Sequence, residues 1–275
     1  MKPFKKITIV GVGLLGGSIG LAIKKNKLAH QVVGYFRTES KIALAVKKGA
    51  IDKGTVCFEE ALKDSDFIIL CSPVSDILKK MSQLTKTKAL ITDTGSTKTA
   101  IAKAGQHLNF VGSHPLAGSE QGGMISARAD LFKNSLCLLT PSGKKSAHAT
   151  AHIAEFWRRI GAKTIILTPE KHDAILAFTS HLPHIVAFSL MAAVPANILS
   201  FAAGGLKDTT RIAMSHPKLW SDIFLTNKNN AMDAITAFEL SLKKIKKLIR
   251  ASNEPGLISF LAKAKNKRAG LPQKS

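Results

Sequence analysis

The sequence predicts an α/β fold in which an N-terminal, doubly wound parallel sheet is followed by an all-α domain. Up to residue 168, short apolar runs alternate with helical segments, a pattern typical of parallel strands joined by crossover helices. From Lys171 to Arg250 the apolar residues recur at helical spacing, without a convincing strand. A chain of 275 residues suits two domains, and we place them at 1–168 and 169–275.

The predicted elements follow one another in the order that such a sheet requires. Strands are expected at 7–10, 31–36, 67–71, 89–92, 110–112, 136–140 and 164–167. Helices in this domain are expected at 18–27, 41–48 and 148–160. Residues 261–275 are basic and poor in large apolar side chains, so we expect a frayed basic tail at the C-terminus.

The chain carries 40 Lys and Arg against 18 Asp and Glu, a net charge of +22. Such a charge concentrates anions around the protein. The basic residues are spread along the chain with only one Tyr and two Trp, whereas a nucleic-acid surface clusters basic and aromatic residues. We therefore expect small anionic substrates or a general compositional bias, and no nucleic acid.

Cys57, Cys71 and Cys137 show neither a paired nor a metal-binding spacing, which predicts free thiols in a reducing compartment. The early lysines and apolar run of residues 1–23 resemble a signal peptide, but five glycines interrupt the run. Histidines and prolines interrupt the apolar segment 174–203, and the polar side chains would be costly in lipid. The sequence thus predicts a cytoplasmic protein without a membrane segment.

Residues 11–16 form a GxGxxG motif, Gly-Val-Gly-Leu-Leu-Gly, which follows a predicted strand and opens a helix. In that setting Gly11 permits a tight turn, Gly13 lets the backbone approach a pyrophosphate, and Gly16 allows close packing of helix on strand. The helix N-terminus offers its N–H groups to phosphate oxygens. We predict a Rossmann-type dinucleotide site, the alternative being a glycine turn without a ligand. The residues assigned to the cofactor here are Gly11, Gly13, Leu14, Leu15, Gly16 and Ser72.

The end of the second predicted strand bears on which nicotinamide cofactor binds. NAD enzymes of this kind place Asp or Glu there, to accept a hydrogen bond from the ribose 2′-OH. Here Phe36 is followed by Arg37 and Thr38, and the first carboxylate is that of Glu39. A guanidinium at this place suits a 2′-phosphate. We therefore favour NADP over NAD; the alternative is that Arg37 is a solvated loop residue.

Four further segments place polar residues among small ones: 93–98, 112–120, 180–184 and 208–213. The first two follow predicted strands, at the edge where ligands bind in such sheets. Together with the glycine motif, these segments resemble the prephenate/arogenate dehydrogenase family, from the first strand to about Asn230. The signal is specific because the separated motifs occur in the family's order.

The resemblance implies oxidative decarboxylation of prephenate to 4-hydroxyphenylpyruvate with hydride transfer to NAD(P), a step of tyrosine biosynthesis. The alternative within the family is arogenate, which would give tyrosine directly. His114 would take the hydroxyl proton, since an imidazole has a pKa near neutrality. Ser96 resembles the serine that hydrogen-bonds this histidine or the substrate hydroxyl. Arg211 resembles the arginine that binds a substrate carboxylate through its planar fork.

The same resemblance implies further substrate contacts. His181 and His184 lie three residues apart, so a helix would present both from one face to the substrate side chain. Lys98 is either a substrate-facing cation or a solvated residue at a helix start, and Glu120 either pairs with Arg211 or is solvated. No third metal ligand accompanies the two histidines, so we expect no metal. The expected substrate contacts are Lys98, Ser119, Glu120, His181, His184 and Arg211.

The apolar stretch 185–203 is hard to bury within one small helical domain, so we expect the C-terminal helices to form a homodimer. The chain ends soon after these helices, and we expect no appended regulatory domain. Two rival functions remain: a 3-hydroxy acid or imine dehydrogenase that shares GxGxxG, and a nucleotide-sensing or nucleic-acid-binding protein without catalysis. Dehydrogenases of the first kind lack the motif that stands at 114–120 in this sequence. A non-catalytic protein of the second kind would leave His114, Ser96 and Arg211 unexplained.

Overall fold

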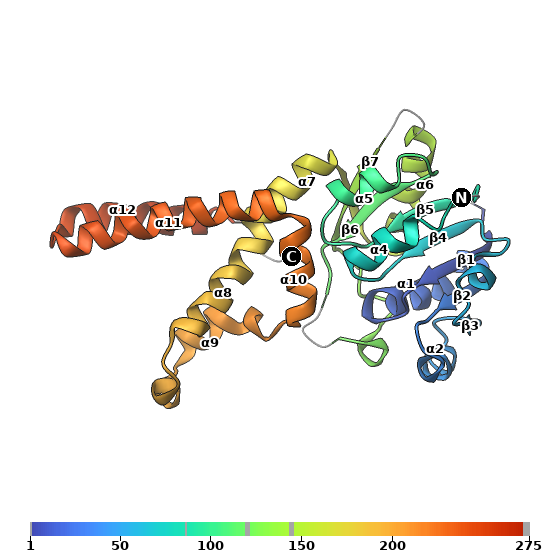
Figure 1. Ribbon diagram of the computed structural model, residues 1–275, viewed down its shortest axis with the longest axis horizontal. Coiled ribbons are helices and arrows are strands. Elements are labelled where there is room, and N and C mark those ends of the chain that lie inside the picture. The colour runs from blue at the N-terminus through green and yellow to red at the C-terminus, as the bar shows by residue number, and fades with distance from the viewer. Residues whose placement is uncertain (1, 86, 119–121, 143–145, 272–275) are drawn as a thin grey trace. The chain divides into compact units, whose positions relative to one another are not determined.

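The structure is a computed structural model, which describes the chain except for residues 1, 86, 119–121, 143–145 and 272–275. The chain forms two compact units, residues 1–228 and 229–275. The first unit contains the strands and the helices that cover them, and the second consists of helices (Figure 1).

A five-stranded parallel sheet forms the centre of the first unit, with the strand order β3-β2-β1-β4-β5. Its strands are β1 (Phe4–Val10), β2 (Ala29–Tyr35), β3 (Lys53–Thr55), β4 (Phe67–Leu70) and β5 (Leu90–Asp93). The chain runs outward from β1 to β3 and then returns to β4 on the other side of β1. This reversal opens a crevice at the carboxyl ends of β1 and β4, the usual ligand site of such sheets.

Two apolar cores cover the faces of this sheet because neighbouring residues of a strand point to opposite sides. In β4, Phe67 and Ile69 belong to one core, while Ile68 and Leu70 belong to the other. Helices lie between the strands along the chain (Figure 1). They are α1 (Leu14–Lys25), η1 (Glu39–Lys41), α2 (Ile42–Lys47), α3 (Phe58–Leu62), α4 (Val74–Met81) and α5 (Thr99–Ala104). All of them but η1 add side chains to these cores.

A second, three-stranded sheet has the order β6-β7-β8. Its strands are β6 (Val111–Pro115), β7 (Leu136–Pro141) and β8 (Lys163–Ile166). Helix α6 (Ser146–Arg159) links β7 to β8, which are parallel, whereas β6 and β7 are antiparallel. Between β6 and β7 the described chain forms only a short 3-10 helix, η2 (Met124–Ser126). Parallel neighbours are usually joined by a crossover helix, and the described connection between these two antiparallel strands contains no such helix.

The predicted doubly wound sheet and its helical continuation are confirmed, and each predicted strand is present. Strand β3 was not predicted, because its sequence Lys-Gly-Thr carries no apolar side chain. It forms the edge of the sheet, where a strand does not need to be buried on both faces. The antiparallel pairing of β6 was not predicted either, since the strand spacing alone does not give strand direction.

Helical segments follow β8 in the first unit. They are α7 (Pro169–Leu176), the π-helical η3 (Ala177–His181), α8 (Leu182–Ala193), η4 (Ala196–Phe201), α9 (Gly204–Thr210), η5 (Arg211–Met214) and α10 (Pro217–Thr226). Thr168 caps α7 by accepting a hydrogen bond from the N–H of Lys171, and Pro169 occupies the first turn. The continuous stretch Pro169–Ala193 is long and apolar enough to cross a membrane, by length and composition only.

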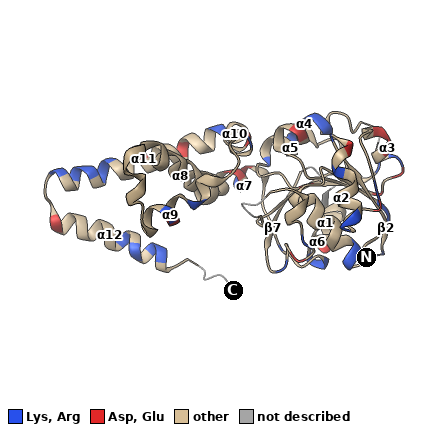
Figure 2. Ribbon diagram, turned by 90° about the horizontal axis from the view of Figure 1, so that it is seen from below, with Lys and Arg blue, Asp and Glu red and all other residues tan. Residues whose placement is uncertain are grey.

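The second unit contains α12 (Glu254–Ala269) and all but the first residue of α11 (Lys228–Arg250). Lys and Arg are frequent along both helices (Figure 2). The predicted frayed tail is wrong for residues 261–269, which belong to α12. The helix forms because Asn253 caps it by accepting from the N–H of Gly256, with Pro255 in the first turn.

Candidate active site

A cavity of about 780 Å³ lies where the carboxyl ends of the strands meet the segments that follow β8. Its walls come from the residues that follow β1, β4, β5 and β6, and from α7 to α10 with their connections. Many of the site residues predicted from the sequence line this one cavity. They are Leu14, Leu15, Ser72, Ser96, His114, His181, His184 and Arg211.

The glycine turn beside the cavity fits a dinucleotide. Gly11 has a φ of +93°, and a Cβ there would lie 3.0 Å from the carbonyl oxygen of Cys71. At Gly13 a Cβ would meet nothing within 4 Å, so the backbone is open to a ligand. Ser72 lines the cavity with a buried hydroxyl that has no hydrogen-bond partner among the described residues. A phosphate or ribose oxygen at this turn would supply that partner.

Arg37 and Thr38 are exposed and directly follow Phe36 beyond the end of β2. They do not line the cavity. The end of β2 is where the adenosine ribose lies in folds of this kind. Their placement therefore suits contact with the far end of the cofactor and not with the reacting ring.

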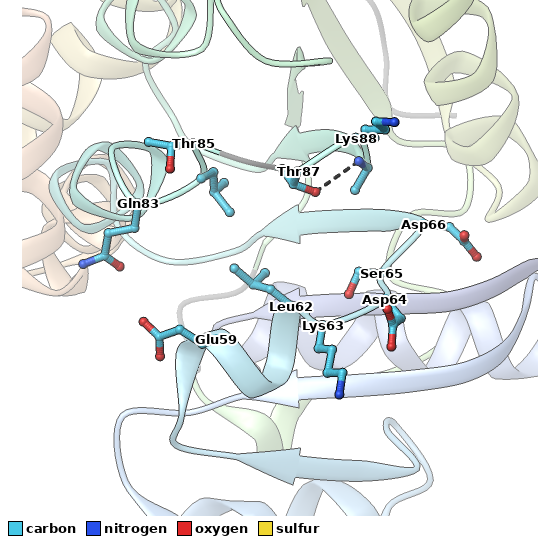
Figure 3. A pocket seen from close by; sticks show the side chains of 12 residues that line it. Glu59, Leu62, Lys63, Asp64, Ser65, Asp66, Gln83, Thr85, Thr87 and Lys88 are labelled. Carbon is cyan, nitrogen blue, oxygen red and sulfur yellow. Dashed lines mark hydrogen bonds between the residues drawn. The ribbon is translucent and has the colours of Figure 1, made fainter.

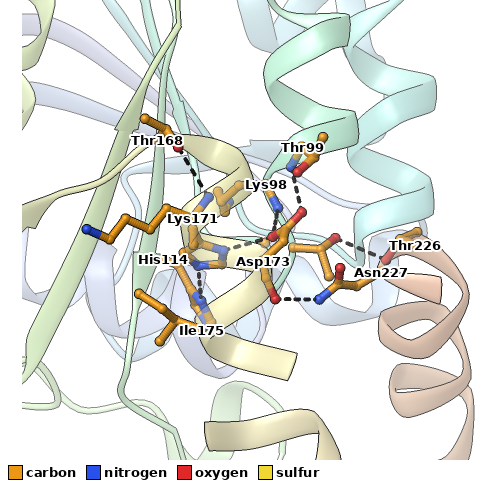
Figure 4. A network of polar contacts seen from close by, with 12 residues as sticks. Lys98, Thr99, His114, Thr168, Lys171, Asp173, Ile175, Thr226 and Asn227 are labelled. Atoms are coloured by element: carbon orange, nitrogen blue, oxygen red, sulfur yellow. Dashed lines mark hydrogen bonds and ion pairs between the residues drawn. The ribbon is translucent and has the colours of Figure 1, made fainter. Parts of the chain in front are cut away.

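Three side chains form a hydrogen-bonded relay that ends at His114, which lines the cavity. Figure 4 shows His114 and Asp173 within this network of polar contacts. His114, in β6, places its Nδ1 2.9 Å from Nε2 of His172. His172 in turn places its Nδ1 2.8 Å from Oδ1 of Asp173. Because a carboxylate can only accept, His172 donates from Nδ1 and accepts at Nε2 from His114. The remaining nitrogen of His114, Nε2, then carries a lone pair, as a general base requires.

Burial keeps His114 neutral. It lowers the pKa of His114 well below its ordinary value, and electrostatic interactions with His172, Lys98 and His181 lower that pKa further. Burial alone would raise the pKa of Asp173. Hydrogen bonds from His172 and from the backbone N–H groups of Lys98 and Thr99 outweigh burial, so the pKa of Asp173 is lowered. The relay therefore combines an ionised carboxylate with a neutral terminal imidazole.

Lys98 differs from both sequence expectations, because it is neither substrate-facing nor solvated. Its side chain is fully buried, and its ammonium group pairs with the carboxylate of Asp93. The same ammonium donates to the carbonyl oxygen of Ser113, at 2.8 Å. Lys98 thus ties the segment that carries Ser96 to the strand that carries His114. A buried ammonium needs such partners, and so it is not available to a ligand.

Two histidines and a tryptophan form the opposite wall of the cavity. His181, at the end of η3, is buried, and burial lowers its pKa to about 4. His184 stacks on Trp220 with 3.4 Å between the ring centroids, and burial lowers the pKa of His184 as well. Both imidazoles are therefore neutral near pH 7. In the described parts of the chain, no group of three or more His, Cys, Asp or Glu side chains could hold a metal ion.

Arg211 and Ser96 enter the cavity from different sides. Arg211 begins η5, directly after α9, and its residue is exposed at the cavity. Ser96 is partly buried and lies beyond the end of β5. It is not the partner of His114 Nδ1, since His172 occupies that position. The predicted contacts Ser119 and Glu120 lie outside the described residues.

His172, Asp173 and Asn227 were not among the residues predicted from the sequence. A signal was present for the first two, because an adjacent His and Asp follow the Thr168–Pro169 helix start by only a few residues. Asn227 gives no such signal. It ends α10, and its side-chain contacts include Asp173 and His181, which lie far away along the chain.

A second cavity, of about 640 Å³, lies at the amino ends of β4 and β5 (Figure 3). It is lined by residues that precede β4 and β5, and none of the predicted site residues is among them. One of its carboxylates, that of Asp66, already accepts from the backbone N–H groups of Lys5 and Lys6.

Comparisons with known proteins return one family. Two family models match: prephenate dehydrogenase, nucleotide-binding domain, over residues 19–173, and prephenate dehydrogenase, dimerization domain, over residues 168–263. A prephenate dehydrogenase of Bacillus subtilis is 34% identical, over 97% of this chain and 76% of that protein. A cyclohexadienyl dehydrogenase of Zymomonas mobilis is 33% identical, over 98% of this chain and 97% of its own length.

Solved structures give the same result. The prephenate dehydrogenase of Aquifex aeolicus in complex with hydroxyphenyl propionate and NAD+ has a TM-score of 0.88 and 35% identity, over 96% of this chain and 97% of that one. Synechocystis arogenate dehydrogenase has a TM-score of 0.82 and 28% identity, over 96% and 99%. A 3-hydroxyisobutyrate dehydrogenase of Salmonella typhimurium, at 14% identity and a TM-score of 0.55, shares the fold alone. The resemblance carried by the sequence motifs is confirmed, and the chain belongs to the prephenate dehydrogenase family of nicotinamide-dependent dehydrogenases.

Proposed function

We propose that this chain oxidises and decarboxylates prephenate to 4-hydroxyphenylpyruvate, with NADP or NAD as hydride acceptor, in tyrosine biosynthesis in the cytoplasm. The observation that carries the proposal is the Asp173–His172–His114 relay, which ends in the cavity beside the glycine turn. In this proposal residues 1–168 hold the dinucleotide, while residues 169–275 complete the substrate site and form the dimer. Arogenate, giving tyrosine, is the alternative substrate.

His114 would accept the proton of the substrate's ring hydroxyl at Nε2, as the carbon that bears the hydroxyl becomes a carbonyl. A nicotinamide cofactor held at the glycine turn would supply the acceptor for the hydride of that carbon. The ring carboxyl then leaves as CO2, and the ring becomes aromatic. The relay stabilises the imidazolium that forms on His114, because His172 accepts from Nδ1 and Asp173 accepts from His172. Ser96, in the same cavity, would donate to or accept from the reacting hydroxyl.

The charge of the cavity favours prephenate over arogenate. Arg211 lines it, and the described residues of its walls include no Asp or Glu. A dianionic substrate needs cations and donors, whereas the ammonium group of arogenate needs an acidic partner. Neutral His181 and His184 supply no such negative charge. These features support prephenate as the main substrate.

A direct assay tests the proposal: absorbance of reduced nicotinamide with prephenate and with arogenate, each tried with NADP and with NAD. We expect the highest kcat/KM with prephenate and NADP. Faster turnover of arogenate would establish the alternative. No reduction with either substrate would end the proposal. Binding to duplex DNA that persists at physiological salt would then support the non-catalytic rival.

Cofactor choice can be tested at Arg37. Arg37→Asp should lower kcat/KM for NADP relative to NAD by roughly tenfold or more, since it replaces a partner of the 2′-phosphate by a repelling carboxylate. Lys103→Asp, on an exposed residue of α5, makes the same change of charge elsewhere and should leave the ratio unchanged. An unaltered ratio in Arg37→Asp would mean that this guanidinium does not touch the 2′-phosphate.

The relay predicts both a pH profile and a variant phenotype. Burial lowers the pKa of His114, so kcat/KM should stay constant through neutral pH and fall only well below the ordinary histidine pKa of 6.5. His172→Phe leaves the Nδ1–H of His114 without an acceptor and should lower kcat by about 10- to 100-fold. Exposed His107, changed to Phe, is the control. A kcat within about threefold of the parent would remove His172 from the mechanism.

We also propose that the chain is a homodimer. Exposed apolar side chains occur in both units, with Phe201 and Met214 82% and 83% exposed in the first and Leu240 and Ile249 each 60% exposed in the second. A second copy would cover such surfaces. Light scattering at micromolar concentration should give twice the chain mass of 29.5 kDa. A value of one chain mass would contradict the dimer.

A further inference from the structure

We propose that Asn227 is a positioning residue that holds His181 in the tautomer with hydrogen on Nε2, so that His181 offers a donor to the substrate side chain. The proposal rests on the proposed function and deepens it. Asn227 does not contact the reacting atoms. The evidence is the pair of hydrogen bonds that its NH2 group makes, one to the Asp173 carbonyl and one to His181.

The amide of Asn227 is fixed by a backbone carbonyl. Asn227 is the C-cap of α10, and its side chain is buried. Its Nδ2 lies 2.8 Å from the carbonyl oxygen of Asp173. A carbonyl oxygen accepts only, so the atom that faces it must be the NH2 group and the orientation of the amide follows. One of the two Nδ2 hydrogens is used in this contact.

The second contact determines the tautomer of His181. The same Nδ2 lies 3.2 Å from Nδ1 of His181. An NH2 group only donates, so Nδ1 accepts and carries no hydrogen. Burial lowers the pKa of His181 to about 4, and a neutral imidazole must then carry its one hydrogen on Nε2. His181 lines the cavity, so the hydrogen that it offers there is the one on Nε2.

His184 takes the opposite form. Its Nδ1 lies 2.9 Å from the carbonyl oxygen of Ser180, which makes Nδ1 the donor and leaves Nε2 as the acceptor of the neutral ring. The rings of His181 and His184 both contact Trp220. The wall therefore pairs one donor with one acceptor. A keto or carboxylate oxygen on the substrate side chain matches the donor of His181.

Asn227 also joins this wall to the reaction relay. The backbone carbonyl that holds its amide belongs to Asp173, whose carboxylate accepts from His172. A single buried side chain thus connects the residue that anchors the base with the residue that faces the substrate. A shift of α10 relative to α7 would alter both.

The wild-type protein allows a first test that does not require turnover. Nitrogen-15 spectra of the histidine rings near pH 7 should show His181 with hydrogen on Nε2, the signal being identified by its loss in His181→Gln. A wild-type His181 with hydrogen on Nδ1 overturns the inference. The spectrum is recorded without substrate, so it tests the tautomer whether or not the protein turns over prephenate or arogenate. Failure to turn over either substrate would reject only the proposed function.

Two variants test the role of the amide. Asn227→Asp keeps the shape but can only accept, so hydrogen should move to Nδ1 of His181, and KM for prephenate should rise about 5- to 100-fold. We expect kcat to change less than KM, because the side chain of Asn227 does not contact the reacting atoms. Asn227→Leu should give a mixture of tautomers and a similar rise in KM, and it remains informative if the aspartate variant does not fold.

Asn26→Asp is the matched control. Asn26 is the C-cap of α1, and its Nδ2 likewise donates to a backbone carbonyl, that of Ala22 at 2.8 Å. It does not line the cavity. The control should change neither the His181 spectrum nor KM. If the Asn227 variants also leave the His181 spectrum and KM unchanged, Asn227 only caps α10 and the inference is wrong.

Discussion

Replacement of His114 by asparagine is expected to lower kcat by roughly 10²- to 10⁴-fold, the range for removal of a general base. Asparagine retains polarity and much of the ring's volume but cannot accept a proton at the position of Nε2. The residual kcat of the variant should not depend on the protonation of residue 114, so the loss should be largest near neutral pH and smaller where the parent loses activity in acid. Stopped-flow or steady-state measurement of reduced nicotinamide gives kcat directly.

Cofactor binding separates this effect from a loss of structure. His114 lies at the end of β6, whereas the glycine turn follows β1, so the dissociation constant of NADP should stay near that of the parent. His107→Asn, at an exposed position of the same domain, should leave kcat unchanged. If kcat of His114→Asn stays within about threefold of the parent, His114 is not the general base, and the hydrogen bonds from His172 and Asp173 have no role in catalysis.

Arg211→Ala is expected to reduce kcat/KM for prephenate by roughly 10²- to 10³-fold, mostly through KM. Truncation of one partner in a desolvated, hydrogen-bonded charge pair has a cost of this order. Arg211→Lys should recover part of the loss, because a lysine supplies the charge but not the planar pair of donors. Lys218→Ala, at an exposed position of α10, is the control.

The two arginine variants also bear on the substrate. If Arg211 holds a carboxylate present in both prephenate and arogenate, the loss should be similar for both. A loss confined to prephenate would place the guanidinium against the side chain, where the two substrates differ. An unchanged KM in Arg211→Ala would show that the guanidinium of Arg211 does not bind a substrate carboxylate.

Local patterns of the sequence determined the fold and the cofactor turn. All four residues of β4 are apolar, and β1 ends in Ile-Thr-Ile-Val, because a central parallel strand is buried on both faces, and such patterns are visible without coordinates. Gly11 and Gly16 are likewise readable from sequence, since the turn between β1 and α1 leaves no room for a side chain. Each of these features depends on residues that are close together along the chain.

Tertiary structure alone decided the state of the reacting groups. From the sequence, Lys98 could be a substrate-facing cation or a solvated residue. Its burial against Asp93 is evident only in the folded chain, where β5 and β6 lie side by side. His114 and His172 are separated by 58 positions, and Asn227 by 46 from His181. Protonation states and tautomers are set by such distant partners and by exclusion of water. A linear pattern can name the imidazole, therefore, but only the folded chain determines which of its nitrogens is the base.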